Sequence, residues 1–334
     1  MKRYRSISLM LAAIAIVGLA LRYAPHIRHR ADAGSIPDLL EFVPADSTIF
    51  GYADVAALRD SPLMQRLAAL ARPAKVDQDY ADFVRVTGFD YQKDLDRVVF
   101  AWRPGPPMQT FVLAEGRFDH ARIERYALQA GKLENQDGHP VYVTPGSAPG
   151  KNVSIAFLAG NRIALSDGSD LRAAFAPAQQ SQLDSAFRER VSRVAGAPVF
   201  AIAKAAGFVA GNAAAAGPSA IASPFASLRW VSVAARPEGG GVLVSADGEC
   251  VNPGDAQKMA SSVEFVRGML NGGVSNPKSR GQMTPETAAA VEHLLQGVRI
   301  TTEEDRVRLL LVITPEMFSL SAPAAGAQRT PAGP

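Results

Sequence analysis

Residues 96–119, DRVVFAWRPGPPMQTFVLAEGRFD, contain the pattern that decides the fold class. Two apolar runs flank a short turn rich in glycine and proline, which is typical of an antiparallel β-hairpin. Arg103 stands before the turn and Arg117 after it. The stretch therefore raises two hypotheses, a plain hairpin and a loop that presents arginines to an anion.

A second stretch, LRWVSVAARPEGGGVLVSADGE at 228–249, has the same layout. Each contains a strand, an Arg-Pro at its end, a turn with glycine and a second strand that ends in a charged glycine turn. Arg236 matches Arg103, but an Asp-Gly-Glu sequence stands where Arg117 would need a counterpart. A shared anion site requires basic residues in both copies, so we favour the hairpin, with its arginine solvated or paired with a carboxylate.

The order of the expected elements also recurs along the chain, which favours a duplication. In the first half we expect a strand at 48–53 followed by a helix that Asp54 caps, a helix after Ser61-Pro62, the hairpin, a helix at 120–131, strands in PVYVT, VSIAFL and RIALS, and a helix in SDLRAAF. In the second half we expect a helix in FRERVSRVAG capped by Asp184, a strand at 198–204, the second hairpin, helices at 255–270 and 284–297, and a hairpin at 298–313.

These patterns predict an α+β fold made of two similar repeats, at 44–180 and 181–320. Hairpins dominate and no β-α-β alternation occurs, so each repeat is expected to be an antiparallel sheet with helices on one face. Residues 31–43 form a predicted linker, and the aperiodic tail 321–334 is expected to be disordered.

The first 30 residues have the pattern of a secretory signal or a membrane anchor. A basic MKRYR precedes the apolar run 7–21, and the only small-x-small cleavage pattern, at 31–33, lies far beyond that run. Fifteen apolar residues are short for a span, but residues 23–27 extend them. We therefore predict an uncleaved signal-anchor at 1–30, a single transmembrane helix in the inner membrane with a periplasmic body; a cleaved signal and a buried helix are the alternatives.

The charge distribution argues against nucleic acid as a partner. The whole chain has a net charge of +3, yet residues 1–30 contain six basic and no acidic residues, so the remainder is mildly acidic. Such a body has no obvious phosphate-binding surface. The single cysteine, Cys250, excludes an intrachain disulfide.

No catalytic, cofactor-binding or metal-ligating residues are predicted. The G-x-S-x-G elbow is missing, and the histidines of the body, His120, His139 and His293, lack the spacing of a helical metal site. The glycines at 211–217 and 239–241 do not fit a phosphate loop, which excludes a nucleotide. The acidic groups Asp77/Asp79/Asp82 and Asp90/Asp94/Asp96 fit no calcium loop and are interpreted as caps and turns, with a weak cation site as the alternative.

Three strings, FVPADSTIFGYADVAALRDSP, TGFDYQKDLDRVV and VLAEGRFDHARI, lie within residues 40–175. There the chain resembles uncharacterised, N-terminally anchored bacterial envelope proteins, a domain of unknown function of acidobacterial type. The resemblance implies the anchor and an extracytoplasmic body, and implies no known activity or catalytic residue.

The sequence thus favours a membrane-anchored, non-enzymatic module of the cell envelope that binds a protein partner or acts as a scaffold. The uncharged Ala/Gly-rich stretch 205–223 is the first place at which a partner or lipid is expected to dock. One alternative is a periplasmic domain that binds a small molecule or lipid in a groove between the repeats. Another is an unfamiliar hydrolase that uses His120 or His139.

Overall fold

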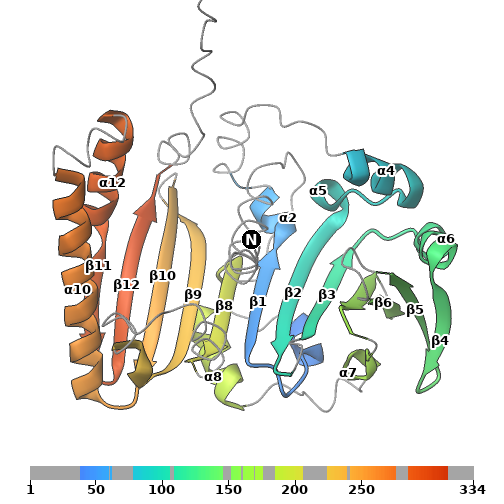
Figure 1. The fold of residues 1–334 in the computed structure, drawn as a ribbon, viewed down its shortest axis with the longest axis horizontal. Coiled ribbons are helices and arrows are strands. Elements are labelled where there is room, and N and C mark those ends of the chain that lie inside the picture. The colour runs from blue at the N-terminus through green and yellow to red at the C-terminus, as the bar shows by residue number, and fades with distance from the viewer. Residues whose placement is uncertain are drawn as a thin grey trace, which may run out of the picture.

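The structure is a computed structural model, and it places twelve strands in one fully antiparallel sheet (Figure 1). The order across the sheet is β11-β12-β10-β9-β8-β1-β2-β3-β7-β6-β5-β4. The residues that the structure describes are 38–59, 61, 78–105, 109–145, 152–158, 161–168, 170–175, 185–205, 224–238, 241–275 and 285–314.

The strands of the sheet are β1 (Ile49–Asp54), β2 (Leu95–Arg103), β3 (Gln109–Gly116), β4 (Lys132–Gln136), β5 (His139–Pro145), β6 (Asn152–Leu158), β7 (Arg162–Ser166), β8 (Val199–Lys204), β9 (Leu228–Glu238), β10 (Gly241–Cys250), β11 (Arg299–Glu303) and β12 (Arg306–Ile313). The helices are η1 (Asp38–Phe42), α2 (Val55–Arg59), α4 (Gln78–Thr87), α5 (Tyr91–Asp94), α6 (His120–Ala130), α7 (Arg172–Phe175), α8 (Ser185–Val194), η2 (Pro224–Ser227), α10 (Pro253–Ser275) and α12 (Pro285–Gly297). This composition confirms the predicted α+β class.

The two halves of the chain meet where β1 pairs with β8 at the middle of the sheet. Phe50 lies opposite Ile202 and Tyr52 opposite Phe200. The Phe50 ring also packs on Phe187 of α8, with 5.0 Å between centroids. One hydrophobic core therefore contains residues from both halves.

Helices cover both faces of the sheet, so the expectation of helices on one face is wrong. On one face η1, α7 and α8 pack on a core that includes Val99 of β2. On the other face α2 and α6 pack on a core that includes Val98. The continuous apolar run at 98–102 has this cause, because a strand that is buried on both faces does not alternate with polar residues.

At the other end of the sheet, α10 and α12 cover the same face as α2 and α6. Met259 of α10 packs with Cys250 of β10 and Val307 of β12. The strand β10 belongs to the hairpin β9–β10 and β12 to the hairpin β11–β12. The two hairpins lie side by side in Figure 1. The two ends of the sheet are therefore built differently.

Most of the predicted elements are confirmed, including the three long hairpins and the helices at 120–130, 253–275 and 285–297. Asp54 caps α2, because its carboxylate accepts a hydrogen bond of 2.7 Å from the Ala57 amide. The strand β4 and the helix α4 were not predicted. The helix after Pro62, the cap Asp184 and the stretch 206–223 lie outside the described residues, as do the anchor and the tail.

The structure describes nothing before Asp38, so the predicted anchor stays a prediction. Among the described ranges, no helix has both the length and the apolar character needed to cross a membrane.

Candidate functional site

A closed ring of four charges lies where the described chain begins. Asp38 of η1 and Glu115 of β3 are the acids, and Arg97 of β2 and Arg162 of β7 each contact both of them. The Arg97 guanidinium donates to Glu115 at 2.6 Å and to Asp38 at 3.1 Å. Each charge has two opposite neighbours, so the ring fastens η1 to three strands.

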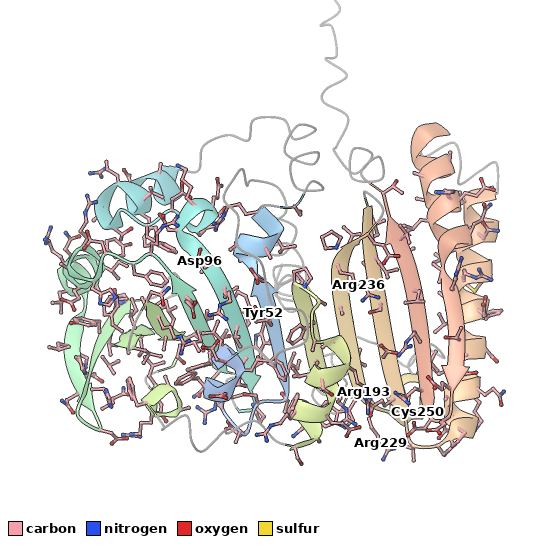
Figure 2. All side chains as sticks on the ribbon, turned by 180° about the vertical axis from the view of Figure 1, so that it is seen from behind. Tyr52, Asp96, Arg193, Arg229, Arg236 and Cys250 are labelled. Atoms are coloured by element: carbon pink, nitrogen blue, oxygen red, sulfur yellow. The ribbon has the colours of Figure 1, made fainter. Side chains whose placement is uncertain are left out.

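Tyr52 of β1 lies beside this ring on the same face of the sheet and shares a side-chain hydrogen bond with Arg97. Burial raises the pKa of the Tyr52 phenol, so the hydroxyl stays neutral, and its oxygen accepts from Arg97, because a guanidinium can only donate. Figure 2 labels Tyr52 near the centre of the sheet, away from its edges. The tyrosine thus joins the ring to the core that the two halves share.

A second carboxylate bound by two arginines, Glu249 of β10, is buried beneath α8. Its two oxygens accept hydrogen bonds from Arg190 and Arg193 of that helix. Arg190 is 8% exposed and Glu249 7%, so water screens this pair very little. The Arg190 guanidinium also stacks over Trp230 of β9, 4.1 Å from the ring centroid. The carboxylate and the aromatic ring together hold α8 on the sheet.

The arginines of the hairpins, weighed as an anion site, each lie beside a carboxylate. Arg103 holds Asp46 in three hydrogen bonds between 2.8 and 3.0 Å. Arg117 donates to Asp94 at 3.0 Å. Arg236 is 3.8 Å from Glu238, and both of these side chains are exposed. Arg103 therefore links β2 to the loop before β1, and Arg117 links the loop after β3 to α5.

The structure does not bring together the two histidines proposed for a hydrolase. His120 stacks on Phe157, with 4.1 Å between centroids, beside the core under α6. His139 stacks on Phe175 of α7, on the opposite face of the sheet. The two imidazoles are thus separated by the sheet, and each has an aromatic neighbour. His293 is exposed on α12.

Of the acidic groups of the first half, Asp90 and Asp94 act in a cap and a turn, whereas Asp96 and Asp82 pair with arginines. Asp90 caps α5 by accepting from the Gln92 amide at 3.0 Å, and Asp94 accepts from the Asp90 amide at 2.9 Å. Asp96 is 3.9 Å from Arg59, and Asp82 pairs with Arg85. Within the described ranges, no three acidic, histidine or cysteine side chains group in a way that could hold a metal ion.

Cys250 is fully buried beneath α10, and burial raises the pKa of its thiol. A neutral, enclosed thiol is a poor nucleophile. We expect iodoacetamide to leave Cys250 unmodified at pH 8 in the folded chain and to alkylate it once guanidinium chloride unfolds the protein. Mass spectrometry of the intact chain measures this, and rapid alkylation under native conditions would contradict the packing of α10 on β10.

Among the described residues, a broad strand surface at one end of the sheet has no helix over it. We call it the open strand surface: the face of β10, β12 and β11 opposite to α10, with the adjoining end of β9. Leu243 pairs with Val312 and Ser245 with Leu310, so Leu243, Val312 and Leu310 lie together there. Val312 is 46% exposed, and Leu243 and Leu310 are half-buried. Figure 2 shows these strands from this side, with α8 lying over β8 beside them.

Charged side chains surround the apolar centre of this surface. Arg236 of β9, labelled in Figure 2, pairs with Leu243 in the strand register, and Arg308, two residues before Leu310, pairs with Asp247 at 2.7 Å. Arg299 of β11 lies opposite Leu310. An apolar centre with a polar rim is the usual layout of a protein–protein contact. Sequence reasoning missed this surface, because it depends on which strands lie side by side.

Comparisons with known proteins add a structural likeness. No family model matches the chain, and no curated protein matches it. Crystal form I of TP0453 is 14% identical, with a TM-score of 0.45, over 88% of this chain and 97% of that one. Crystal form III is 12% identical, with a TM-score of 0.47, over 87% of this chain and 98% of that one. At such values the likeness carries no information about function.

Proposed function

We propose that this chain is a membrane-anchored, extracytoplasmic module of the cell envelope that binds a protein partner through the open strand surface, without catalysis. The observation that carries the proposal is the apolar group Leu243, Leu310 and Val312 with its charged rim. Exposed apolar patches rimmed by polar residues commonly mark places where proteins interact.

The ring of four charges around Glu115 supports the proposal that the folded body lies close to the predicted anchor. Asp38, the first described residue, belongs to that ring. Residues 31–37 would therefore reach at most about 25 Å from the predicted anchor to the body, at roughly 3.5 Å per residue. A tether this short keeps the folded body next to the membrane surface.

We also infer that the two halves arose by duplication, and the strand register supports this. Phe50 pairs with Ile202 and Tyr52 with Phe200. A two-fold axis midway between these two pairs, perpendicular to the sheet, would superimpose Phe50 on Phe200. Following the register outward places Arg103 on Arg236. The next strands outward, β3 and β10, also place matching residues on each other.

The same axis places Glu115 on Glu249. Both are buried or nearly buried carboxylates bound by two arginines, at the same end of their hairpins. The proposed symmetry breaks outside these strands, where α10 and α12 occupy one end of the sheet and β4 and β5 the other. The open strand surface belongs to the second half alone.

No observation favours a ligand site in a groove between the halves. The central strands β1 and β8 hydrogen-bond directly to each other. Phe187 fills the space above them by packing on both Phe50 and Trp230. The small-molecule and lipid alternative is therefore not proposed for this junction.

A site-specific crosslink tests the proposal. We expect a photoreactive residue at Leu310, in the full chain in its native membrane, to form one main adduct with an envelope protein. The same residue at Leu133, 56% exposed on the far edge strand β4, is the control and should not form it. Adding Val312→Asp should reduce the Leu310 adduct at least about tenfold, as for a contact at the centre of an interface. An adduct that Val312→Asp leaves unchanged would contradict the proposal.

A further inference from the structure

The helix α10 is apolar on two opposite sides, and only one of them is covered. Ala256 and Met259 are buried against the sheet. On the outward side of the C-terminal half, Phe265 is 67% and Met269 60% exposed, and Leu270, on the flank nearer the sheet, is 55% exposed. A helix that is apolar on both sides is normally covered on both. We call these three residues, with Val266 at 39% exposed, the α10 patch.

Two glycines lie one turn apart beside this patch. Apart from the adjoining backbone of α10 itself, no atom lies within 4 Å of the position that a Cβ would take at Gly268 or at Gly272. Each glycine costs a helix about 1 kcal/mol relative to alanine. The described chain makes no use of the space that they leave, so the helix has a shallow groove next to the ridge of Phe265 and Met269.

The ridge and the groove are complementary to each other. Rows of side chains four residues apart pack into the grooves of a second helix at a crossing angle of about −50°. Phe265 and Met269 form one such row, and Gly268 and Gly272 form the neighbouring row. Two copies of α10 related by a two-fold axis near Gly268 would each insert a ridge into the groove of the other.

The charges beside the patch favour another protein surface over a lipid surface. Lys258, on the same side of α10 as Phe265 and Met269, is paired with Asp255 at 3.2 Å, and Arg267 on the other flank is paired with Glu264 at 2.7 Å, so these pairs add no net charge. A helix that lies on a membrane surface usually carries several basic residues beside its apolar face. A neutral patch that complements itself fits a second copy of the same chain.

We propose that the α10 patch is the contact of a two-fold homodimer of this protein. The dimer leaves the open strand surface free, because α10 covers the opposite face of the sheet. It is therefore independent of the proposed partner. Anchored copies that share a membrane would meet at a raised effective concentration, which favours the contact further.

The first test measures the oligomeric state of the full chain in a mild non-ionic detergent by analytical ultracentrifugation. We expect a dimer, and Met269→Lys should raise its dissociation constant at least about tenfold, because a buried lysine at the centre of a contact has no partner. The side chain is 60% exposed in the single chain, so folding stays intact, as circular dichroism checks. A monomeric wild type, or a dimer as tight in the variant, would overturn the proposal.

The second test locates the contact. In native membranes, oxidation should link Gly268→Cys copies to a covalent dimer, because a close crossing at this residue brings the two Cα atoms within about 7 Å. Lys258→Cys, exposed at the other end of α10, is the matched control and should stay unlinked. The native Cys250 is buried and does not contribute. Equal linking of both variants would reflect collisions and would overturn the two-fold contact.

Discussion

Replacing Glu249 with alanine should lower the free energy of unfolding by about 3–5 kcal/mol. The substitution leaves Arg190 buried and charged with no carboxylate, and Arg193 loses the same partner. The Arg190 Nε already lacks a hydrogen-bond partner, so the site has no spare acceptor for the freed charge. Guanidinium chloride unfolding of the full chain in detergent, followed by circular dichroism, measures the change.

Two further variants separate charge from packing. Glu238→Ala removes a carboxylate that is 57% exposed, and its effect should stay below about 1 kcal/mol. Combining Glu249→Leu with Arg190→Met should recover much of the stability, because an apolar pair of similar volume often replaces a buried ion pair without loss. A small effect of Glu249→Ala would mean that water reaches the carboxylate beneath α8.

The elements that the sequence predicted well have local signals. Hairpins show Gly/Pro turns between apolar runs, and α6 starts after Asp119, whose carboxylate accepts from the Arg122 amide at 3.1 Å. The strand β4, KLENQ, was missed because it lies at the edge of the sheet and has only Leu133 as an apolar residue. Its signal was the Asp137-Gly138 turn, which has the positive φ angles of a two-residue hairpin.

The buried ion pairs and the open strand surface could not be predicted from the sequence. Their members lie far apart in the chain: Asp38 meets Arg162, and Leu243 meets Val312. Alignment of the two hairpin sequences matched Glu115 with Asp247, since each precedes a glycine. The strand register instead places Glu115 on Glu249, because pairing across strands fixes that correspondence.

Replacing Phe50 with alanine should also cost about 3–5 kcal/mol, because it removes a fully buried ring from the centre of the sheet. The ring contacts Phe187 at 5.0 Å and Phe200 at 6.4 Å between centroids, and both belong to the second half. The loss should therefore weaken both halves together. Leu133→Ala, at a side chain 56% exposed on β4, is the control and should change stability by no more than about 0.5 kcal/mol.

The two tryptophans make this prediction specific, since Trp102 lies in the first half on β2 and Trp230 in the second on β9. In Trp102→Phe the fluorescence reports the second half, and in Trp230→Phe it reports the first. If the aromatic core joins the halves, Phe50→Ala should move both transitions to the same lower denaturant concentration. Two transitions that separate, with only the first half weakened, would mean that the halves unfold as independent units despite their common sheet.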